Sequence, residues 1–182
     1  MSATFYPPKD GLLTIALIDP KKGFGETGQY TKYEGDLRDM IKHALAARTV
    51  GLEVRFYYRG LSSDQGEKVA SQVIETWIPP EHVQPFHTHH TLHEMTLIIE
   101  GEVVAVDSDT LSEEDLRASL RDGSLLSHGA VVRTHEMVIE GPGTRHTIVN
   151  ATYAYAKLIT VQTARMSLSD FPSDWHRDAP AS

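Results

Sequence analysis

Eight short stretches rich in Val, Ile, Thr and Tyr alternate with Gly- and Pro-containing turns, and this pattern limits the fold to a sandwich or barrel of strands. The predicted strands cover residues 52–59, 68–78, 82–89, 94–106, 125–133, 135–140, 145–150 and 153–163. The segment 94–106 is apolar on both of its alternating faces, which a barrel wall facing water would not tolerate. We therefore expect the N-terminal elements or a second subunit to cover its outer face.

Two segments have the pattern of helices instead. In 35–48 an apolar stripe recurs at helical spacing, and it consists of Leu37, Met40, Ile41, Ala44 and Leu45. In 112–121, Ser112 and Asp115 resemble a capping pair, and Gly123 follows as a stop signal. The sequence therefore predicts one amphipathic helix before the strands and one short helix inserted among them.

Length, charge and composition exclude several classes of partner and of functional site. The 182 residues make one domain with a sizeable core, and the net charge of −8 argues against nucleic acid or an anionic membrane as a partner. The absence of cysteine excludes disulfides, thiolate metal sites and iron–sulfur clusters. The apolar run 11–18 is too short to span a bilayer and lacks the flanks of a signal peptide. We expect a soluble, cytoplasmic protein.

Histidines gather in one place: five of the ten lie between residues 82 and 93. Residues two apart in a strand project to the same face, so His87 and His89 present two imidazoles side by side. Glu94 opens the next predicted strand, and His146 follows a Gly-Pro-Gly turn and can face the same cavity. Three imidazoles and one carboxylate suit a divalent transition ion, namely Fe²⁺, Mn²⁺, Ni²⁺, Cu²⁺ or Zn²⁺.

The spacing of these residues resembles the two motifs of the cupins. The first is His-x-His, four residues, Glu, six residues, Gly; the second places His three residues after Gly and Asn four residues later. They correspond here to His87, His89, Glu94 and Gly101, and then to Gly143, His146 and Asn150. Glu81 and His135 stand where cupins commonly have the glycine that begins each motif, and the Pro is shifted by one residue. These departures concern the turns, not the ligands.

The resemblance covers residues 68–163 and implies an all-β, cupin-type double-stranded β-helix, a jelly-roll barrel with the metal inside. Within this single domain we expect residues 1–66 to form a strand and helix packed on the barrel, 67–164 to form the barrel, and 165–182 to form an irregular arm. The helix within 112–121 is then an insertion at one rim. We also expect a homodimer.

Other polar residues near the motifs are expected to play lesser roles. His90 and His93 are expected outside the ligand set, His82 is expected to be an ordinary rim or strand residue, and Asn150 is expected to form a turn. Strand alternation predicts that Arg145 points away from His146. It also names four candidates for a general base inside the barrel, which are Glu53, Tyr57, Glu75 and Glu136.

The cupin resemblance leaves three functions open, because one fold hosts many chemistries. The first is an Fe²⁺ dioxygenase acting on a small enolisable or phenolic substrate. The second is a redox-neutral isomerase, epimerase or lyase in which the ion polarises a carbonyl. The third is a non-catalytic module that binds a small molecule.

Overall fold

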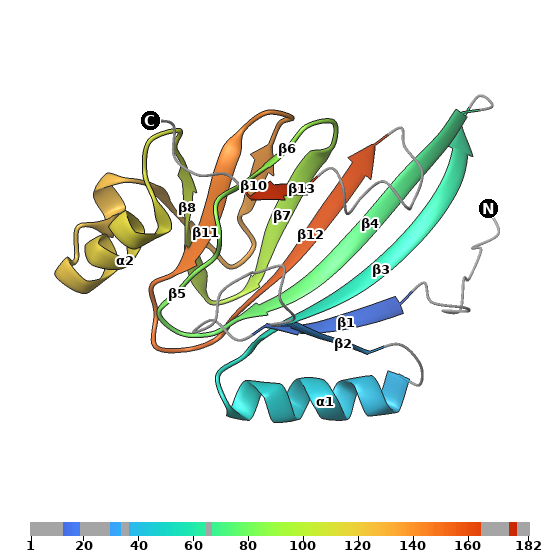
Figure 1. Ribbon diagram of the computed structural model, residues 1–182, viewed down its shortest axis with the longest axis horizontal. Helices are drawn as coiled ribbons and strands as arrows, with labels where there is room; N and C mark the ends of the chain where they lie inside the picture. Colours follow the sequence, from blue (N-terminus) through green and yellow to red (C-terminus); the bar gives the residue numbers. More distant parts are fainter. Residues whose placement is uncertain (1–12, 19–29, 34–36, 65–66, 165–174, 178–182) are drawn as a thin grey trace.

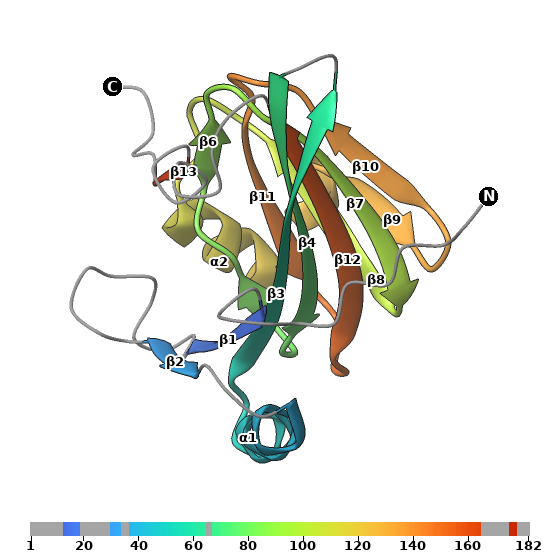
Figure 2. The ribbon, with the colours of Figure 1, turned by 90° about the vertical axis from the view of Figure 1, so that its right-hand side faces the viewer.

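The computed structural model describes residues 13–18, 30–33, 37–64, 67–164 and 175–177. In this part of the chain two antiparallel sheets face each other (Figures 1 and 2), which confirms the all-β prediction. The first sheet has the order β10 (Met137–Glu140), β7 (His93–Glu100), β12 (Ala156–Ala164), β4 (Glu67–Ile78), β3 (Glu53–Asp64), β1 (Leu13–Ile18) and β2 (Tyr30–Tyr33). The second has the order β13 (Trp175–Arg177), β6 (His87–His89), β11 (Arg145–Asn150), β8 (Glu102–Asp107) and β9 (Ala130–Arg133), with β5 (His82–Val83) also paired to β11.

Three of the predicted strands are broken in the structure. The segment 94–106 is two strands, β7 and β8, because Gly101 between them has a φ of 84° and the chain there crosses from the first sheet to the second. The segment 82–89 divides into β5 and β6 around Pro85, which has no backbone N–H to donate to a ladder. The segment 125–133 begins with a 3₁₀ helix, Leu125–Ser127, and becomes a strand only at Ala130.

The first predicted helix exists as α1 (Leu37–Thr49), but of the predicted apolar stripe only Ala44 is buried among the residues whose side chains are described. Ala44 and Ala47 are buried, whereas Ile41 is 44% and Leu45 57% exposed. Small alanines allow the helix to approach the first sheet closely, and they pack with Leu17, Val54 and Phe56. The larger side chains of Ile41 and Leu45 are turned outward.

The second predicted helix is α2 (Glu113–Asp122), and its predicted ends are confirmed. The Ser112 side chain accepts from the backbone N–H of Asp115, whose carboxylate in turn accepts from the Ser112 N–H. Gly123 ends the helix in the left-handed conformation. Leu116 is fully buried against Phe86, Val106 and other residues of the second sheet, so the insertion covers the outer face of that sheet (Figure 1).

The space between the sheets holds the main core. Its apolar members come from both sheets and include Ile78, Ile98, Ile148 and Leu158. On the outer face of the first sheet, Met137 is 51% and Ile139 65% exposed, so no described element covers these residues. The homodimer stays a prediction.

The arm expected after residue 164 is not wholly irregular. Residues 175–177 form β13, which pairs with β6 so that Trp175 lies opposite His89. The His-x-His strand therefore has a neighbour on each side, β11 and β13.

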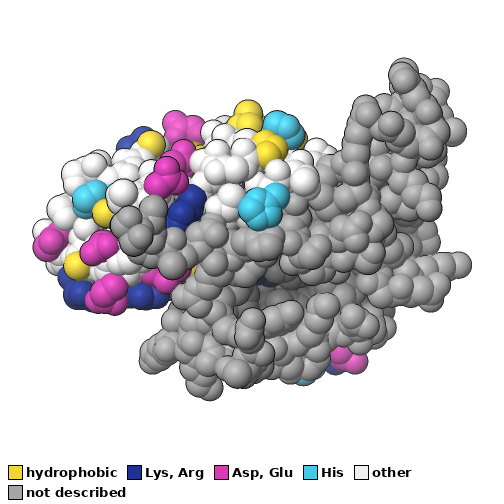
Figure 3. Space-filling model, turned by 45° about the horizontal axis from the view of Figure 1, so that its top comes forward, with side chains coloured by type: hydrophobic (Ala, Val, Ile, Leu, Met, Phe, Trp, Pro, Cys, Tyr) yellow, Lys and Arg dark blue, Asp and Glu magenta, His cyan; other side chains and the backbone are white. Residues whose placement is uncertain are grey.

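Other surface features complete the description. Over the end of the molecule that carries α2, at the left of Figure 3, acidic and basic side chains are intermixed. Arg121, for example, lies 3.2 Å from Glu114. Among the described residues, no helix is long and apolar enough to cross a membrane.

Candidate metal centre

The two sheets bring together the four side chains that the sequence analysis named as ligands. His87 and His89 lie on β6, His146 lies on β11 directly opposite His87, and Glu94 comes from β7 of the facing sheet. Each of the four residues offers one potential ligand atom, an imidazole nitrogen or a carboxylate oxygen. These four atoms all lie within 4.8 Å of one another. Because donors around a transition ion sit at roughly 2.0–2.2 Å from it, donors on opposite sides are about 4 Å apart. Only small movements would place all four on one ion.

Backbone carbonyls orient two of the imidazoles. His87 Nδ1 lies 3.1 Å from the carbonyl oxygen of Pro85, and His146 Nδ1 lies 2.9 Å from that of Thr144. A neutral imidazole has one N–H, so donation from Nδ1 leaves the lone pair on Nε2. Metal-binding histidines usually donate a hydrogen bond in this way from the ring nitrogen that does not bind the ion.

The nitrogen of His146 that faces the cluster lacks a hydrogen bond. Nε2 of His146 is buried and has no hydrogen-bond partner among the described residues; Oε1 of Glu94 lies 3.8 Å away. Buried polar atoms are rarely left in this state, and an exception calls for an explanation. A metal ion would supply the missing partner, so the donor set fits a divalent transition ion.

At His87 and Glu94, electrostatics favour the protonation states that a metal needs. At His146 burial lowers the pKa, but Glu94 offsets this and raises it above its ordinary value. Burial and the neighbouring His146 lower the pKa of His87 to about 3. Burial alone would raise the pKa of Glu94, but its contacts with His146 and His89 hold it well below its ordinary value. At neutral pH His87 is therefore neutral and Glu94 is ionised, as metal ligation requires.

The turns that begin the two motifs keep their expected backbone geometry. Glu81 has a φ of 51° and His135 a φ of 72°, and no other non-glycine residue of the described chain has a positive φ. These are the two positions at which cupins commonly have glycine, which adopts such angles without strain. At these two positions the chain therefore differs from the cupin pattern in its side chains, while the backbone keeps a positive φ.

The sheet order and the four clustered side chains together decide the architecture. The chain has the cupin fold. No family model matches the sequence, and no curated protein matches it.

Several solved structures resemble this cupin fold in part. They include an oxalate oxidase in complex with the substrate analogue glycolate, at 19% identity over 53% of this chain and 43% of that chain, with a TM-score of 0.40. A double-stranded β-helix protein from Klebsiella pneumoniae matches at 15% identity over 60% of this chain and 76% of that chain, with a TM-score of 0.40. A cupin 2 conserved barrel domain protein from Salinispora arenicola matches at 16% identity over 57% and 80% of the two chains, with a TM-score of 0.38. The match spans less than half of the oxalate oxidase chain.

Sequence reasoning missed two polar residues beside the cluster, of which one contacts Glu94 and the other holds the first. Gln162 on β12 donates from Nε2 to Oε2 of Glu94 at 2.7 Å, and Gln72 on β4 donates to Oε1 of Gln162, also at 2.7 Å. Both are buried. The sequence shows that both glutamines alternate with apolar neighbours. It does not show the strand pairing that places Gln162 beside Glu94 and Gln72 beside Gln162.

Sequence reasoning also missed Glu140, a second acidic group next to the cluster. It lies opposite Glu94 in the β10–β7 pair and is 8% exposed, so its side chain shares the inner face with Glu94. Burial and the nearby Asp107 raise the pKa of Glu140 to about 7. The alternation that suggested Glu136 points equally to Glu140, four residues further along the strand.

The four residues predicted as bases have other roles, where the structure describes them. Glu75 pairs with Lys157 at 2.9 Å on the outer face of the first sheet, and Glu136 is exposed and accepts from the Arg133 N–H. Tyr57 lies on β3, but its side chain is outside the described residues. Only Glu53 points inward with a described side chain.

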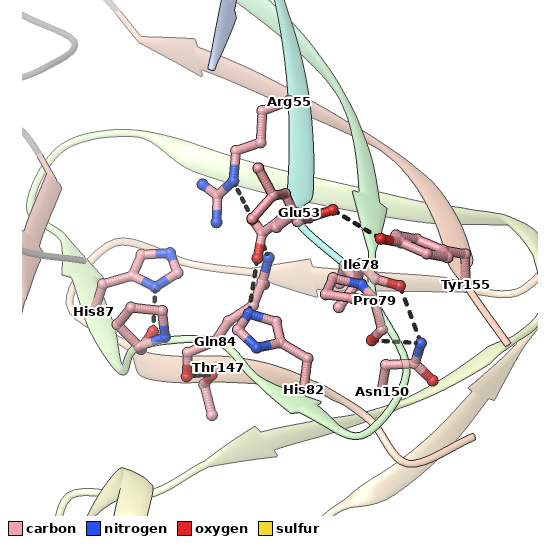
Figure 4. A network of polar contacts seen from close by, with 12 residues as sticks. Glu53, Arg55, Ile78, Pro79, His82, Gln84, His87, Thr147, Asn150 and Tyr155 are labelled. Atoms are coloured by element: carbon pink, nitrogen blue, oxygen red, sulfur yellow. Dashed lines mark hydrogen bonds and ion pairs between the residues drawn. The ribbon is translucent and has the colours of Figure 1, made fainter. Parts of the chain in front are cut away.

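Glu53 is fully buried and belongs to a separate cluster of polar side chains (Figure 4). Its carboxylate accepts from Arg55 Nε at 2.5 Å and from Gln84 Nε2 at 3.1 Å, and it lies 2.9 Å from His82 Nε2. His82 is therefore a buried partner of Glu53 on β5, which agrees with the strand position expected for it and not with one at the rim. The cluster joins β3 of the N-terminal part to β5 of the barrel.

The remaining predictions for single residues agree with the structure in part. His90 and His93 are exposed and lie outside the four-residue cluster. Arg145 points away from it, packs 3.9 Å from the Phe86 ring centre and donates to the carbonyl oxygens of Ser108 and Leu111. Asn150 orders a turn through its side chain, which donates to the carbonyl oxygens of Ile78 and Pro79 (Figure 4) and also to that of Ala154.

Proposed function

We propose that this chain is a metal-dependent dioxygenase with one Fe²⁺ ion held by His87, His89, Glu94 and His146. The observation that carries the proposal is the convergence of three imidazoles and one carboxylate within 4.8 Å inside a barrel. The proposed substrate is a small enolisable or phenolic compound, which can offer two oxygens to the open positions of a six-coordinate ion.

Each ligand has a stated role in the proposal. When bound, iron would supply Lewis acidity and one-electron redox chemistry. Glu94 contributes a negative charge that favours the higher oxidation states, and the carbonyl contacts of His87 and His146 hold their rings in place. The apolar residues Ile98, Ile148 and Leu158, which lie between the sheets, limit the access of water.

The test is oxygen uptake by the reconstituted protein. The chain is stripped with a chelator, loaded anaerobically with Fe²⁺, and offered diphenols and 1,3-diketones with and without O₂. We expect O₂ consumption that depends on iron and substrate and is absent in His146→Ala. The matched control is His93→Ala, whose exposed side chain lies outside the cluster and whose loss should leave uptake unchanged. Equal turnover without O₂ contradicts the dioxygenase.

One observation favours a second candidate, a redox-neutral isomerase or lyase. Such a reaction needs a group that takes up a proton from the substrate near the ion, and the carboxyl of Glu140 is buried on the inner face opposite Glu94. This candidate predicts turnover with redox-silent Zn²⁺ and the appearance of solvent deuterium in the product. Loss of deuterium incorporation in Glu140→Gln, with metal content unchanged, would support it.

A further inference from the structure

A row of inward-facing polar residues crosses the first sheet at the level of the cluster. Gln162 of β12 pairs with Glu94 of β7 on one side and with Gln72 of β4 on the other. Residues directly opposite each other in an antiparallel pair share a face and lie in contact. The row brings together three side chains separated by 68 and 90 residues in the sequence.

The hydrogen bonds along this row can run in one direction only. An ionised carboxylate accepts but cannot donate, so the group of Gln162 that faces Glu94 must be its NH₂. The carbonyl oxygen of Gln162 then faces Gln72 and accepts from the Gln72 NH₂ at 2.7 Å. Gln72 therefore fixes the amide orientation that Gln162 needs in order to donate to Glu94.

The other oxygen of Glu94 is held as well. Thr96 Oγ1 donates to Oε1 at 3.3 Å and lies 2.8 Å from Thr160 Oγ1, one row away on β12. Oε2 receives Gln162 at 2.7 Å and lies 3.0 Å from His89 Nε2. Both oxygens are thus restrained, and the hydrogen bonds from Thr96 and Gln162 orient the carboxylate without cancelling its charge.

We propose that Gln162, held in orientation by Gln72, is a positioning residue that fixes the Glu94 carboxylate for metal binding. The inference rests on the metal site of the proposed function. It assigns to β4 and β12 a part in tuning an ion whose ligands lie on β6, β7 and β11. Outer contacts of this kind typically change metal affinity about 10- to 100-fold when they are removed.

The test measures Co²⁺ and Zn²⁺ binding by the full chain and needs no substrate. We expect Gln162→Leu to weaken binding about 10- to 100-fold and to shift the visible absorption of bound Co²⁺, because Glu94 can then rotate. Gln72→Leu should change both readouts in the same direction by a smaller factor, because it acts through Gln162. Circular dichroism verifies that each variant is folded before titration.

Gln84→Leu is the matched control. Gln84 is a buried glutamine like Gln162, but its amide donates to Glu53 and not to Glu94. It should lower the melting temperature of the chain while leaving the Co²⁺ spectrum and affinity as in the wild type. If Gln162→Leu binds Co²⁺ with wild-type affinity and spectrum, the positioning role is wrong although the metal site stands. If the wild-type chain binds neither ion, the proposed function fails together with this inference.

Discussion

Replacing Glu53 with Gln should lower the free energy of unfolding by about 3 kcal/mol at pH 7. The carboxylate is fully buried, and it contacts Arg55 at 2.5 Å and His82 at 2.9 Å. Gln has nearly the same shape but no charge, so the Arg55 guanidinium, on a side chain only 14% exposed, loses its counter-charge. Removal of one partner from a buried ion pair costs about 3–5 kcal/mol.

The pKa of Glu53 gives the same magnitude independently. Burial would raise it, but Arg55 and then His82 lower it from 4.5 to about 2. Such a difference between the unfolded and folded chain corresponds to about 3 kcal/mol. Because the folded-state pKa is the lower one, this stabilisation is fully present above about pH 5 and is lost as the pH falls towards 2.

Urea unfolding of both proteins at pH values from 7 down to 3 tests this reasoning. The difference between wild type and Glu53→Gln should be largest at pH 7 and should shrink below pH 5. The double variant Glu53→Gln/Arg55→Gln should cost less than the sum of the two single variants, by about 1–3 kcal/mol. Glu75→Gln is the control, because its outer-face pair with Lys157 should be worth under about 1 kcal/mol. A difference that stays constant with pH, or additive single variants, would refute the argument.

Three further predictions concern stability and are checked by thermal or urea unfolding. Glu81→Gly and His135→Gly should each stabilise the chain by about 0.5–1 kcal/mol, because both positions have positive φ; destabilisation would show that the side chains contribute more than the backbone strain costs. Gly129→Ala should destabilise it by about 2 kcal/mol or more, because the new Cβ would lie 2.3 Å from the Ala105 carbonyl oxygen, and a wild-type melting temperature would contradict this. Asn150→Leu should cost about 3 kcal/mol, since the buried carbonyls of Ile78 and Pro79 lose their donor, whereas a loss below about 1 kcal/mol would mean that water replaces it.

The features of this protein that could be predicted depend on residues that lie close together in the sequence. The capping pair Ser112 and Asp115 lies within one helical turn, and the His-x-His alternation lies within one strand. Such patterns depend on bond geometry that any chain shares, so the helix ends and the shared face of His87 and His89 could be read directly. The approach of Glu94 to the same face could also be predicted, because only a short turn separates it from the strand that carries His87 and His89.

Residues that depend on strand register could not be predicted in the same way. Gln162 reaches Glu94 because β12 lies between β4 and β7, and the β12–β7 pairing contains an irregularity at Lys157 and Leu158. A shift of one residue there would turn Gln162 to the opposite face, and the sequence does not mark its position. The helical spacing of apolar residues in α1 was predicted correctly. Which face of the helix is buried depended on how closely the helix could approach the sheet, and the sequence does not show this.

Two of the buried carboxylates, Glu53 and Glu94, differ in a way that predicts the response to metal. Glu53 is satisfied by Arg55, His82 and Gln84, whereas the cluster around Glu94 leaves Nε2 of His146 without a hydrogen bond among the described residues. A ligand that binds only the folded chain stabilises it by about 2.7 kcal/mol at 100 times its dissociation constant. Adding Zn²⁺ to the chelator-treated chain should therefore raise its melting temperature, and the rise should disappear in His146→Leu but persist in Glu53→Gln. An equal rise in His146→Leu would place the ion elsewhere, because of these two clusters it is the one around Glu94 that contains a buried histidine nitrogen without a hydrogen-bond partner among the described residues.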